Sequence, residues 1–224
     1  MNYIVIPAYQ PDNKLIKLIE KIHEKSDFRI LVIDDGSSSK CQNIFDKAEQ
    51  YATVLRHQVN QGKGQSLKTA LDYIQQQNSY GTVVTADADG QHKIWDIFRT
   101  ANKASENPNK LILGVRAFTG KVPLRSRFGN SLTKALFKIQ TGVEVADTQT
   151  GLRAFTTSLI PFMLRIEGNR YEYEMNMLLE ATKEYQILEV PIETVYINDN
   201  EGSHFRPIRD GLMIYKNIFK FALS

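Results

Sequence analysis

Short apolar runs alternate with helical patterns along the first half of the chain. The runs comprise residues 3–6, 30–33, 53–55, 82–85 and 111–113. Between them, apolar residues recur at the three- and four-residue spacing of a helix face: Leu15, Leu18, Ile19 and Ile22, and then Leu67, Ala70, Leu71 and Ile74. Strands that alternate with helices in this way are typical of a mainly parallel sheet with helices on both faces. The pattern therefore predicts an α/β fold.

The second half of the chain is less regular. Its spacing predicts helices at residues 131–138 and 175–184, and a β-like pair follows at 188–190 and 194–197. An amphipathic helix is expected at residues 208–223. No internal repeat or linker-like segment interrupts the chain. The prediction is therefore one domain spanning residues 1–224.

The composition is that of an ordinary soluble globular domain, with 42% hydrophobic and 24% charged residues in a chain of 224. The single cysteine, Cys41, excludes an internal disulfide and fits a reducing compartment. The amino terminus does not resemble a signal peptide, and no stretch reaches the roughly 18 apolar residues of a membrane-spanning helix. We therefore expect a cytoplasmic protein that would meet any membrane substrate at the surface.

Charge is unevenly distributed, although the net charge of +3 is too small to indicate a nucleic-acid partner. Segment 116–138 contains no acidic residue and these basic ones: Arg116, Lys121, Arg125, Arg127, Lys134 and Lys138. Such a run is usually a solvated loop and helix face. The alternative is a surface that meets phosphate groups.

Polar residues follow the predicted strands, where ligands of parallel sheets collect. The sharpest signal is Asp87-Ala88-Asp89, directly after a buried run. Two carboxylates one residue apart in an extended segment project to the same side. They could hold Mg²⁺ or Mn²⁺, which accept carboxylate and phosphate oxygens together. A plain turn is the alternative, because Asp and Gly are common turn residues.

Two further segments follow strands. In segment 34–37 (DDGS), an Asp can accept hydrogen bonds from a nucleobase or ribose, or can simply cap the next helix. Segment 60–64 (NQGKG) precedes a predicted helix, and glycines there expose backbone N–H groups, a common anion site. It is neither a Walker A loop nor a dinucleotide fingerprint, since Gly64 follows Lys63 and Leu67 occupies the third glycine position.

Later segments are dense in polar groups. Segment 147–153 (DTQTGLR) is rich in side-chain donors and acceptors, and segment 202–206 (GSHFR) carries groups that can bear positive charge. Segment 171–174 (YEYE) opens a predicted helix, where acidic groups are also favoured by the helix dipole. The four histidines lack metal-ligand spacing, so no zinc site is expected.

Taken in order, these segments resemble the family 2 glycosyltransferases with the GT-A fold, and most closely the dolichyl- and polyprenyl-phosphate sugar transferases. The matching segments are 6–9 (IPAY), 32–37 (VIDDGS), 60–64 (NQGKG), 87–92 (DADGQH), 114–116 (GVR), 147–153 (DTQTGLR) and 202–206 (GSHFR). Each motif is modest, but their joint order is specific. The resemblance implies a GT-A type domain with a donor half at about residues 1–115 and an acceptor half at about 116–224.

The resemblance also implies roles for individual residues. Nucleotide-sugar binding falls to Pro7, Ala8, Tyr9, Asp35, Lys63, Asp87, Ala88 and Asp89. The metal, Mg²⁺ or Mn²⁺, is held by Asp87, Asp89 and Gln91. Acceptor or phosphate contacts are implied for Arg127, Arg153, Glu174, Ser203 and Arg206, and catalytic roles for Asp89, Asp147, Arg116 and Arg127.

The implied function is inverting, metal-dependent transfer of a sugar from a UDP- or GDP-sugar to a polyprenyl phosphate. The expected location is the inner face of the membrane, reached through the basic segment and last helix or through a separate membrane-protein partner. Two features depart from many relatives. His204 stands where they carry Lys, which moves the phosphate contact to Arg206 or Arg209, and their membrane helices are not seen in this sequence.

Three alternatives remain. A hydroxyl acceptor on a glycan would require a general base, for which Asp147 or Glu174 is the candidate. A sugar-phosphate nucleotidyltransferase is disfavoured, since those enzymes are glycine-rich after the first strand and this chain has PAYQP at residues 7–11. A nucleotide-sugar-binding regulatory domain is disfavoured by the intact pair of Asp87 and Asp89.

Overall fold

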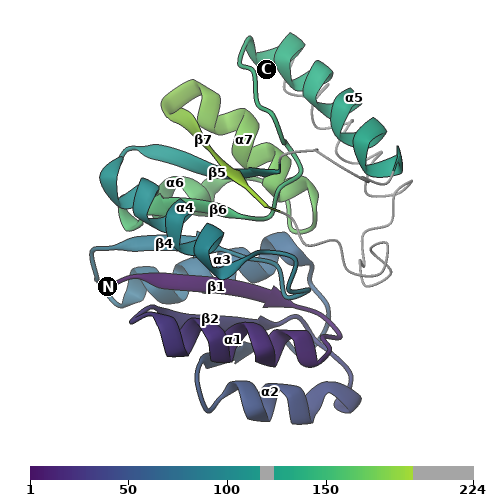
Figure 1. Ribbon diagram of the computed structural model, residues 1–224, viewed down its shortest axis with the longest axis vertical. Helices are drawn as coiled ribbons and strands as arrows, with labels where there is room; N and C mark the ends of the chain where they lie inside the picture. Colours follow the sequence, from purple (N-terminus) through teal and green to yellow (C-terminus); the bar gives the residue numbers. More distant parts are fainter. Residues whose placement is uncertain (117–123, 194–224) are drawn as a thin grey trace.

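A seven-stranded sheet lies at the centre of the protein (Figure 1). The computed structural model describes residues 1–116 and 124–193, with residues 124–132 described as backbone alone. The strand order is β3-β2-β1-β4-β6-β5-β7. Neighbouring strands are parallel except for β6, which runs antiparallel to β4 and β5. The strands are β1 (Tyr3–Ala8), β2 (Arg29–Asp34), β3 (Thr53–Arg56), β4 (Thr82–Thr85), β5 (Lys110–Arg116), β6 (Arg153–Thr156) and β7 (Gln186–Ile192).

Helices cover both faces of this sheet. They are α1 (Asn13–Lys25), α2 (Gln42–Ala48), α3 (Lys63–Gln76), α4 (Ile94–Glu106), α5 (Leu124–Thr141), α6 (Ile160–Arg165) and α7 (Glu172–Glu184), with short 3₁₀ turns at Ser39–Cys41 and Thr157–Leu159. Tyr3 and Val5 of β1 pack with α3, α6 and α7, whereas Ile4 and Ile6 pack with α1, α2 and α4. Because successive strand side chains point to opposite faces, β1 contributes to two hydrophobic cores.

Helix α1 shows how local sequence sets an element. Asp12 caps its amino end, and its Oδ1 accepts a hydrogen bond from the backbone N–H of Lys14 at 2.7 Å. Leu15, Ile19 and Ile22 are fully buried against the sheet. Burial of each such side chain stabilises the fold by about 1.5–3 kcal/mol relative to exposure. The apolar spacing seen in the sequence is therefore the face that holds α1 in place.

The predicted fold class is confirmed. All five apolar runs are strands, and the two helical patterns correspond to α1 and α3. The helix predicted at residues 131–138 is part of the longer α5, and the helix predicted at 175–184 is most of α7. The strand β6 and the helices α2, α4 and α6 were not predicted. The strand predicted at 194–197 and the helix predicted at 208–223 lie outside the described residues.

The chain order brings the carboxyl ends of β1, β2 and β4 together. After β1 the chain forms β2 and β3 on one side, then crosses to form β4 on the other. The backbone N–H of Asp35 donates to the carbonyl of Ala8 at 2.9 Å, and that of Ala86 donates to Val5 at 3.0 Å. A reversal of this kind opens a crevice outside the carboxyl ends of the strands. Segments 7–9, 34–37 and 87–89 therefore meet at one edge of the sheet.

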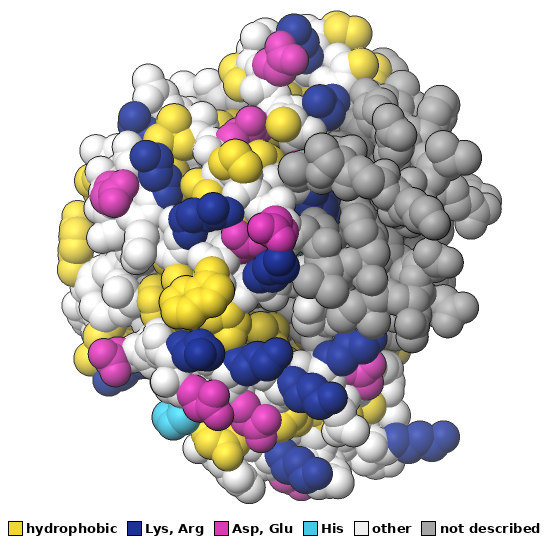
Figure 2. Space-filling model, in the orientation of Figure 1, with side chains coloured by type: hydrophobic (Ala, Val, Ile, Leu, Met, Phe, Trp, Pro, Cys, Tyr) yellow, Lys and Arg dark blue, Asp and Glu magenta, His cyan; other side chains and the backbone are white. Residues whose placement is uncertain are grey.

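The surface seen in Figure 2 mixes charges of both signs. Basic and acidic side chains are interspersed over the face that carries α1 and α4, with hydrophobic side chains between them. Trp95 of α4 is 67% exposed, and the Lys25 ammonium lies 5.7 Å from its ring centroid. Within the described ranges, no helix combines the length and apolar character that a membrane crossing requires.

Candidate active site

Both carboxylate oxygens of Asp35, which follows β2, have two polar partners each within the protein. Its Oδ1 accepts a hydrogen bond from the backbone N–H of Gln61 at 2.9 Å and lies 2.8 Å from Nδ1 of His57. Its Oδ2 accepts from the backbone N–H of Gly62 and from Nδ2 of Asn60, both at 2.8 Å. The side chain is buried. Both of its oxygens thus have partners within the protein, so Asp35 holds the loop after β3, and the nucleoside contact expected from the sequence stays a prediction.

The glycines of segment 60–64 permit close packing. A Cβ on Gly62 would lie 2.5 Å from the carbonyl oxygen of Asn169, and one on Gly64 would lie 2.5 Å from Cβ of Tyr173. Gly62 also has φ of +104°, in the left-handed region that favours glycine. These positions need glycine because the segment before α7 lies directly against them.

Three backbone donors in and next to this loop are occupied. The N–H groups of Gln61 and Gly62 bind Asp35, and that of Gln65 donates to the carbonyl of Asn169 at 2.8 Å. An anion site needs such groups to be free. These three donors therefore do not form the phosphate-binding site that the glycines suggested.

Lys63 joins three distant segments of the chain. Its Nζ donates to Oδ1 of Asp87 at 2.7 Å and lies 2.9 Å from Oε2 of Glu174. Lys63 begins α3, Asp87 follows β4, and Glu174 lies in the first turn of α7. Nε2 of His92 lies 3.4 Å from the other oxygen of Asp87. We call these four residues the Lys63 cluster.

The charges of the cluster support one another. Burial by itself lowers the pKa of Lys63, but the carboxylates of Asp87 and Glu174 outweigh it and raise that pKa above its ordinary value. Burial would raise the pKa of Asp87, yet Lys63 and His92 hold it below the ordinary range. For Asp89, burial and then the charge of Asp87 raise the pKa. Asp87 is therefore a stable anion, and Asp89 ionises at a cost.

Gly151 leaves the space that Asp87 occupies. A Cβ at this position would lie 2.3 Å from Oδ2 of Asp87. The carbonyl of Gly151 accepts a hydrogen bond from Oγ1 of Thr85 at 2.8 Å, which ties the segment before β6 to β4. The glycine in the TGLR motif thus sets the position of the carboxylate.

The chemistry of Asp87 and Asp89 fits a divalent cation. Both follow β4, and Oδ1 of Asp89 accepts from the backbone N–H of Gln91 at 3.0 Å. Two buried atoms of the Lys63 cluster, Oε1 of Glu174 and Nδ1 of His92, have no hydrogen-bond partner among the described residues. Over the described ranges, no group of three or more His, Cys, Asp or Glu side chains surrounds one point. A metal here would thus take two carboxylates and complete its shell with other oxygens, as Mg²⁺ and Mn²⁺ do with phosphates.

Arg116 and Asp147 form a two-point ion pair. Nε of Arg116 donates to Oδ2 of Asp147 at 2.5 Å, and its terminal nitrogen donates to Oδ1 at 3.0 Å. Asp147 is fully buried and also accepts from the backbone N–H of Gln149 at 3.1 Å. Bidentate pairs of this kind fix geometry as well as charge. Asp147 therefore orients Arg116 at the end of β5.

Arg153 lies beneath the acidic groups and not at the surface. It is 1% exposed, and its guanidinium donates to the backbone carbonyls of Thr150, at 3.0 Å, and Glu174. Burial lowers its pKa, while the nearby charges of Glu174, Asp147 and others raise it. The direct phosphate contact expected for Arg153 does not fit this position, because the side chain is buried and its guanidinium donates to backbone carbonyls. It acts as a buried counter-ion instead.

The remaining predicted residues divide into two groups. Pro7 and Ala8 end β1 beside β2, and Tyr9, 37% exposed, follows them at the carboxyl edge of the sheet. Ala88 lies between the two aspartates. The side chains predicted to contact phosphates at Arg127, Ser203 and Arg206 lie outside the described part of the chain. The roles of His57 and His92 were missed, because neither shows a spacing that indicates its carboxylate partner.

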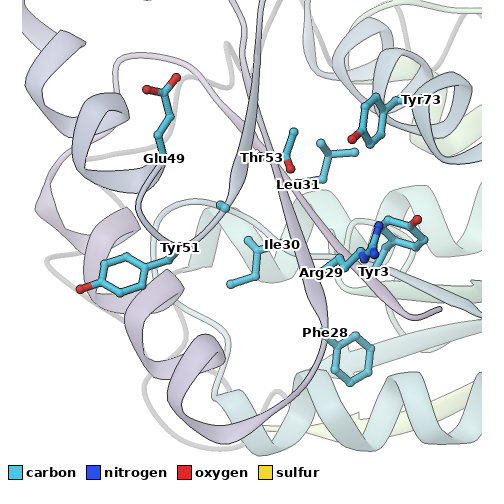
Figure 3. A pocket seen from close by; sticks show the side chains of 10 residues that line it. Tyr3, Phe28, Arg29, Ile30, Leu31, Glu49, Tyr51, Thr53 and Tyr73 are labelled. Carbon is cyan, nitrogen blue, oxygen red and sulfur yellow. The ribbon is translucent and has the colours of Figure 1, made fainter. Parts of the chain in front are cut away.

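A cavity of about 390 Å³ lies at the opposite edge of the sheet (Figure 3). Tyr3, Arg29 and Thr53, which line it, are the first residues of β1, β2 and β3, and Tyr73 of α3 faces it as well. The carboxylates that could bind a metal follow the last residues of the strands. This cavity is therefore separate from the candidate site.

Comparisons with known proteins agree with this arrangement. The chain is 27% identical over 215 residues to UDP-N-acetylglucosamine–dolichyl-phosphate N-acetylglucosaminyltransferase of Methanococcus voltae, covering 87% of this chain and 85% of that protein. It is 26% identical over 170 residues to undecaprenyl-phosphate 4-deoxy-4-formamido-L-arabinose transferase of Shewanella sediminis, covering 72% of this chain and 50% of that protein.

The fold also matches solved structures. Glucosyl-3-phosphoglycerate synthase of Mycobacterium tuberculosis, in complex with Mn²⁺, UDP and phosphoglyceric acid, superposes with a TM-score of 0.70 at 18% identity. The match covers 100% of this chain and 78% of that one, and it confirms the GT-A fold. The sequence model described as glycosyl transferase family 2 matches residues 3–164. With that match over most of the described residues, this chain belongs to glycosyl transferase family 2.

Proposed function

We propose that this glycosyltransferase moves a sugar from a nucleotide-sugar donor to a polyprenyl phosphate, with inversion at the anomeric carbon and with a divalent metal. The observation that carries the proposal is the pair Asp87 and Asp89 at the carboxyl end of β4, where the sheet order reverses. In the reaction, the bond between the anomeric carbon and the donor diphosphate breaks. A bond to an acceptor oxygen forms, and the nucleoside diphosphate leaves.

The donor side is proposed to lie at the ends of β1, β2 and β4. Asp87 and Asp89, with Gln91, would hold Mg²⁺ or Mn²⁺, and such an ion stabilises the negative charge of a leaving diphosphate as a Lewis acid. Tyr9 follows β1 at the same edge and is 37% exposed, so its ring could contact a nucleoside. Mn²⁺ and UDP occur together in the solved M. tuberculosis enzyme of the same fold, which is consistent with this choice.

The acceptor is proposed from the relatives. Two of them are named for transfer to dolichyl or undecaprenyl phosphate. A phosphate acceptor is already anionic at neutral pH, so no general base is required. Arg116, oriented by Asp147, would supply fixed positive charge near the reacting groups. Arg127, Ser203 and Arg206 are proposed to add further phosphate contacts.

A hydroxyl acceptor is the alternative, and one observation favours it. Oε1 of Glu174 is buried and has no partner in the described part of the chain, so this carboxylate could accept a proton from a hydroxyl group. Asp147 is less suited to that role, because both of its oxygens are bound. The M. tuberculosis structure holds phosphoglyceric acid, which shows that this fold also serves acceptors that are not lipids.

A transfer assay tests the proposal. The purified protein is incubated with UDP-N-acetylglucosamine, Mn²⁺ and dolichyl phosphate in detergent, and lipid products are measured by mass spectrometry. Parallel reactions use a GDP-sugar, a polyprenol that lacks the phosphate, and EDTA. We expect glycosyl phospholipid only with the phosphorylated acceptor and metal. Transfer to hydroxyl acceptors alone would contradict the lipid-phosphate proposal and support the alternative.

A further inference from the structure

Lys63 occupies an oxygen that a metal would need. Its ammonium lies 2.7 Å from Oδ1 of Asp87, so one of the two proposed metal carboxylates is already paired. A dication and an ammonium cannot both approach one carboxylate oxygen closely, because their repulsion at a few ångströms is several kcal/mol even at an effective dielectric constant of about 20. Metal binding at Asp87 therefore requires Lys63 to move.

Glu174 is a second ion-pair partner for Lys63. Its Oε2 lies 2.9 Å from Nζ, and no residue that the structure describes bonds its Oε1. Lys63 can therefore release Asp87 while remaining paired with Glu174, through a small change in side-chain torsions. The backbone of Lys63 stays in place during this change, because the glycines on either side hold it against the start of α7 and the segment before it.

We propose that the ammonium of Lys63 pairs with Asp87 in the nucleotide-free enzyme. When a nucleoside diphosphate binds together with the metal, Lys63 breaks this pair and the metal binds Asp87 in its place. The diphosphate supplies anionic oxygens that the ammonium can bind in place of Asp87. Metal alone supplies no such oxygen, so the ammonium would keep Glu174 but lose one of its two anionic partners without replacement. Metal and nucleotide therefore bind cooperatively, and each raises the affinity for the other by the same factor. This inference rests on the proposed donor and metal sites.

Binding of Mn²⁺ to the metal-free, nucleotide-free protein provides the test. Electron paramagnetic resonance measures free Mn²⁺ during titration of the wild type, Lys63→Met and Lys63→Gln, without nucleotide and then with saturating UDP or GDP. Lys68→Met is the matched control, because Lys68 lies on the same helix with its ammonium over the Tyr173 ring. Circular dichroism and thermal unfolding establish which variants are folded. One folded Lys63 variant is enough for the comparison with the wild type.

We expect the wild type and Lys68→Met to bind Mn²⁺ weakly alone and at least about tenfold more tightly with nucleotide, a coupling of ordinary size. Either Lys63 variant should bind Mn²⁺ alone about tenfold more tightly than the wild type and lose most of the nucleotide effect. Equal Mn²⁺ affinities of wild type and Lys63 variants, with nucleotide coupling retained, would overturn the role of Lys63 alone. Absence of Mn²⁺ binding under all conditions would overturn the metal site, and this inference with it.

Discussion

Asp89 is held in an unfavourable electrostatic position. Its pKa is raised by burial and by the charge of Asp87. A group whose pKa is raised on folding stabilises the protein most below its unfolded pKa, and that contribution is lost as the pH rises through the folded pKa. At neutral pH the metal-free protein therefore loses stability by ionising Asp89. This cost is typical of a carboxylate placed to meet a cation.

Asp89→Asn should consequently stabilise the metal-free protein while abolishing sugar transfer. Thermal unfolding in EDTA at pH 7 should show a higher midpoint, by about 2–4 °C for each kcal/mol gained. The gain should vanish below the ordinary Asp pKa of about 3.9, where the wild-type side chain is also neutral. Asp72→Asn, exposed on α3, is the control. Unchanged stability at pH 7 would contradict the electrostatic argument, and retained transfer would contradict the metal role.

Asp35 combines a structural and a functional prediction. The sequence led us to expect that Asp35→Ala raises KM for the donor with kcat nearly unchanged, as for a contact that is equal in ground and transition states. The structure adds a loss of folding free energy, because the variant leaves the buried N–H of Gly62 without its partner, at about 1–3 kcal/mol. It also removes the part-buried hydrogen bonds from Asn60 and Gln61. Urea unfolding and steady-state kinetics measure the two effects.

Asp46→Ala provides the comparison for Asp35→Ala, because Asp46 is an exposed carboxylate that bonds Gln42 on α2. It should change neither quantity appreciably. A large fall in kcat for Asp35→Ala at unchanged KM would place Asp35 nearer to the chemistry than this structure does.

At the level of elements, the start of α3 and the start of α7 depend on each other. Gly64→Ala should lower the free energy of unfolding by about 1–3 kcal/mol, as overpacking of a filled site does. The added Cβ would lie 2.5 Å from Cβ of Tyr173, and this outweighs the better helix propensity of Ala, which is about 1 kcal/mol. Chemical denaturation measures the change, with the next residue as control in Gln65→Ala. If Gly64→Ala were as stable as the wild type, the start of α7 would have to be free to shift.

For the whole molecule, the proposed lipid acceptor implies contact with a membrane surface. Segment 116–138 carries basic residues without an acidic one, and each Lys or Arg near an anionic surface contributes about 1 kcal/mol. The protein should therefore sediment with anionic vesicles at low salt and detach as salt rises, because the attraction is screened. Neutral phosphatidylcholine vesicles are the control. Equal binding to both, or none at low salt, would contradict an electrostatic surface contact.

The pattern of the sequence determined the class of fold and the edge of the sheet at which we propose the chemistry. Short apolar runs predicted five strands, and the polar residues after them marked the carboxyl edge at segments 34–37 and 87–89. These features can be predicted from the sequence because they depend on near neighbours in the chain. The strand β6 could not be predicted, since its four residues follow a polar segment and its pairing with β4 and β5 is non-local.

The tertiary structure alone decided which polar groups are free and which are occupied. Asp35 and the N–H groups of Gln61 and Gly62 looked like ligand contacts, but they bind each other across 26 and 27 residues. Lys63, Asp87 and Glu174 are brought together from the starts of two helices and the end of a strand. The physical reason is that hydrogen bonds and ion pairs act over a few ångströms in space. Sequence spacing reveals the type of group and its element, but only the packing of elements determines its partner.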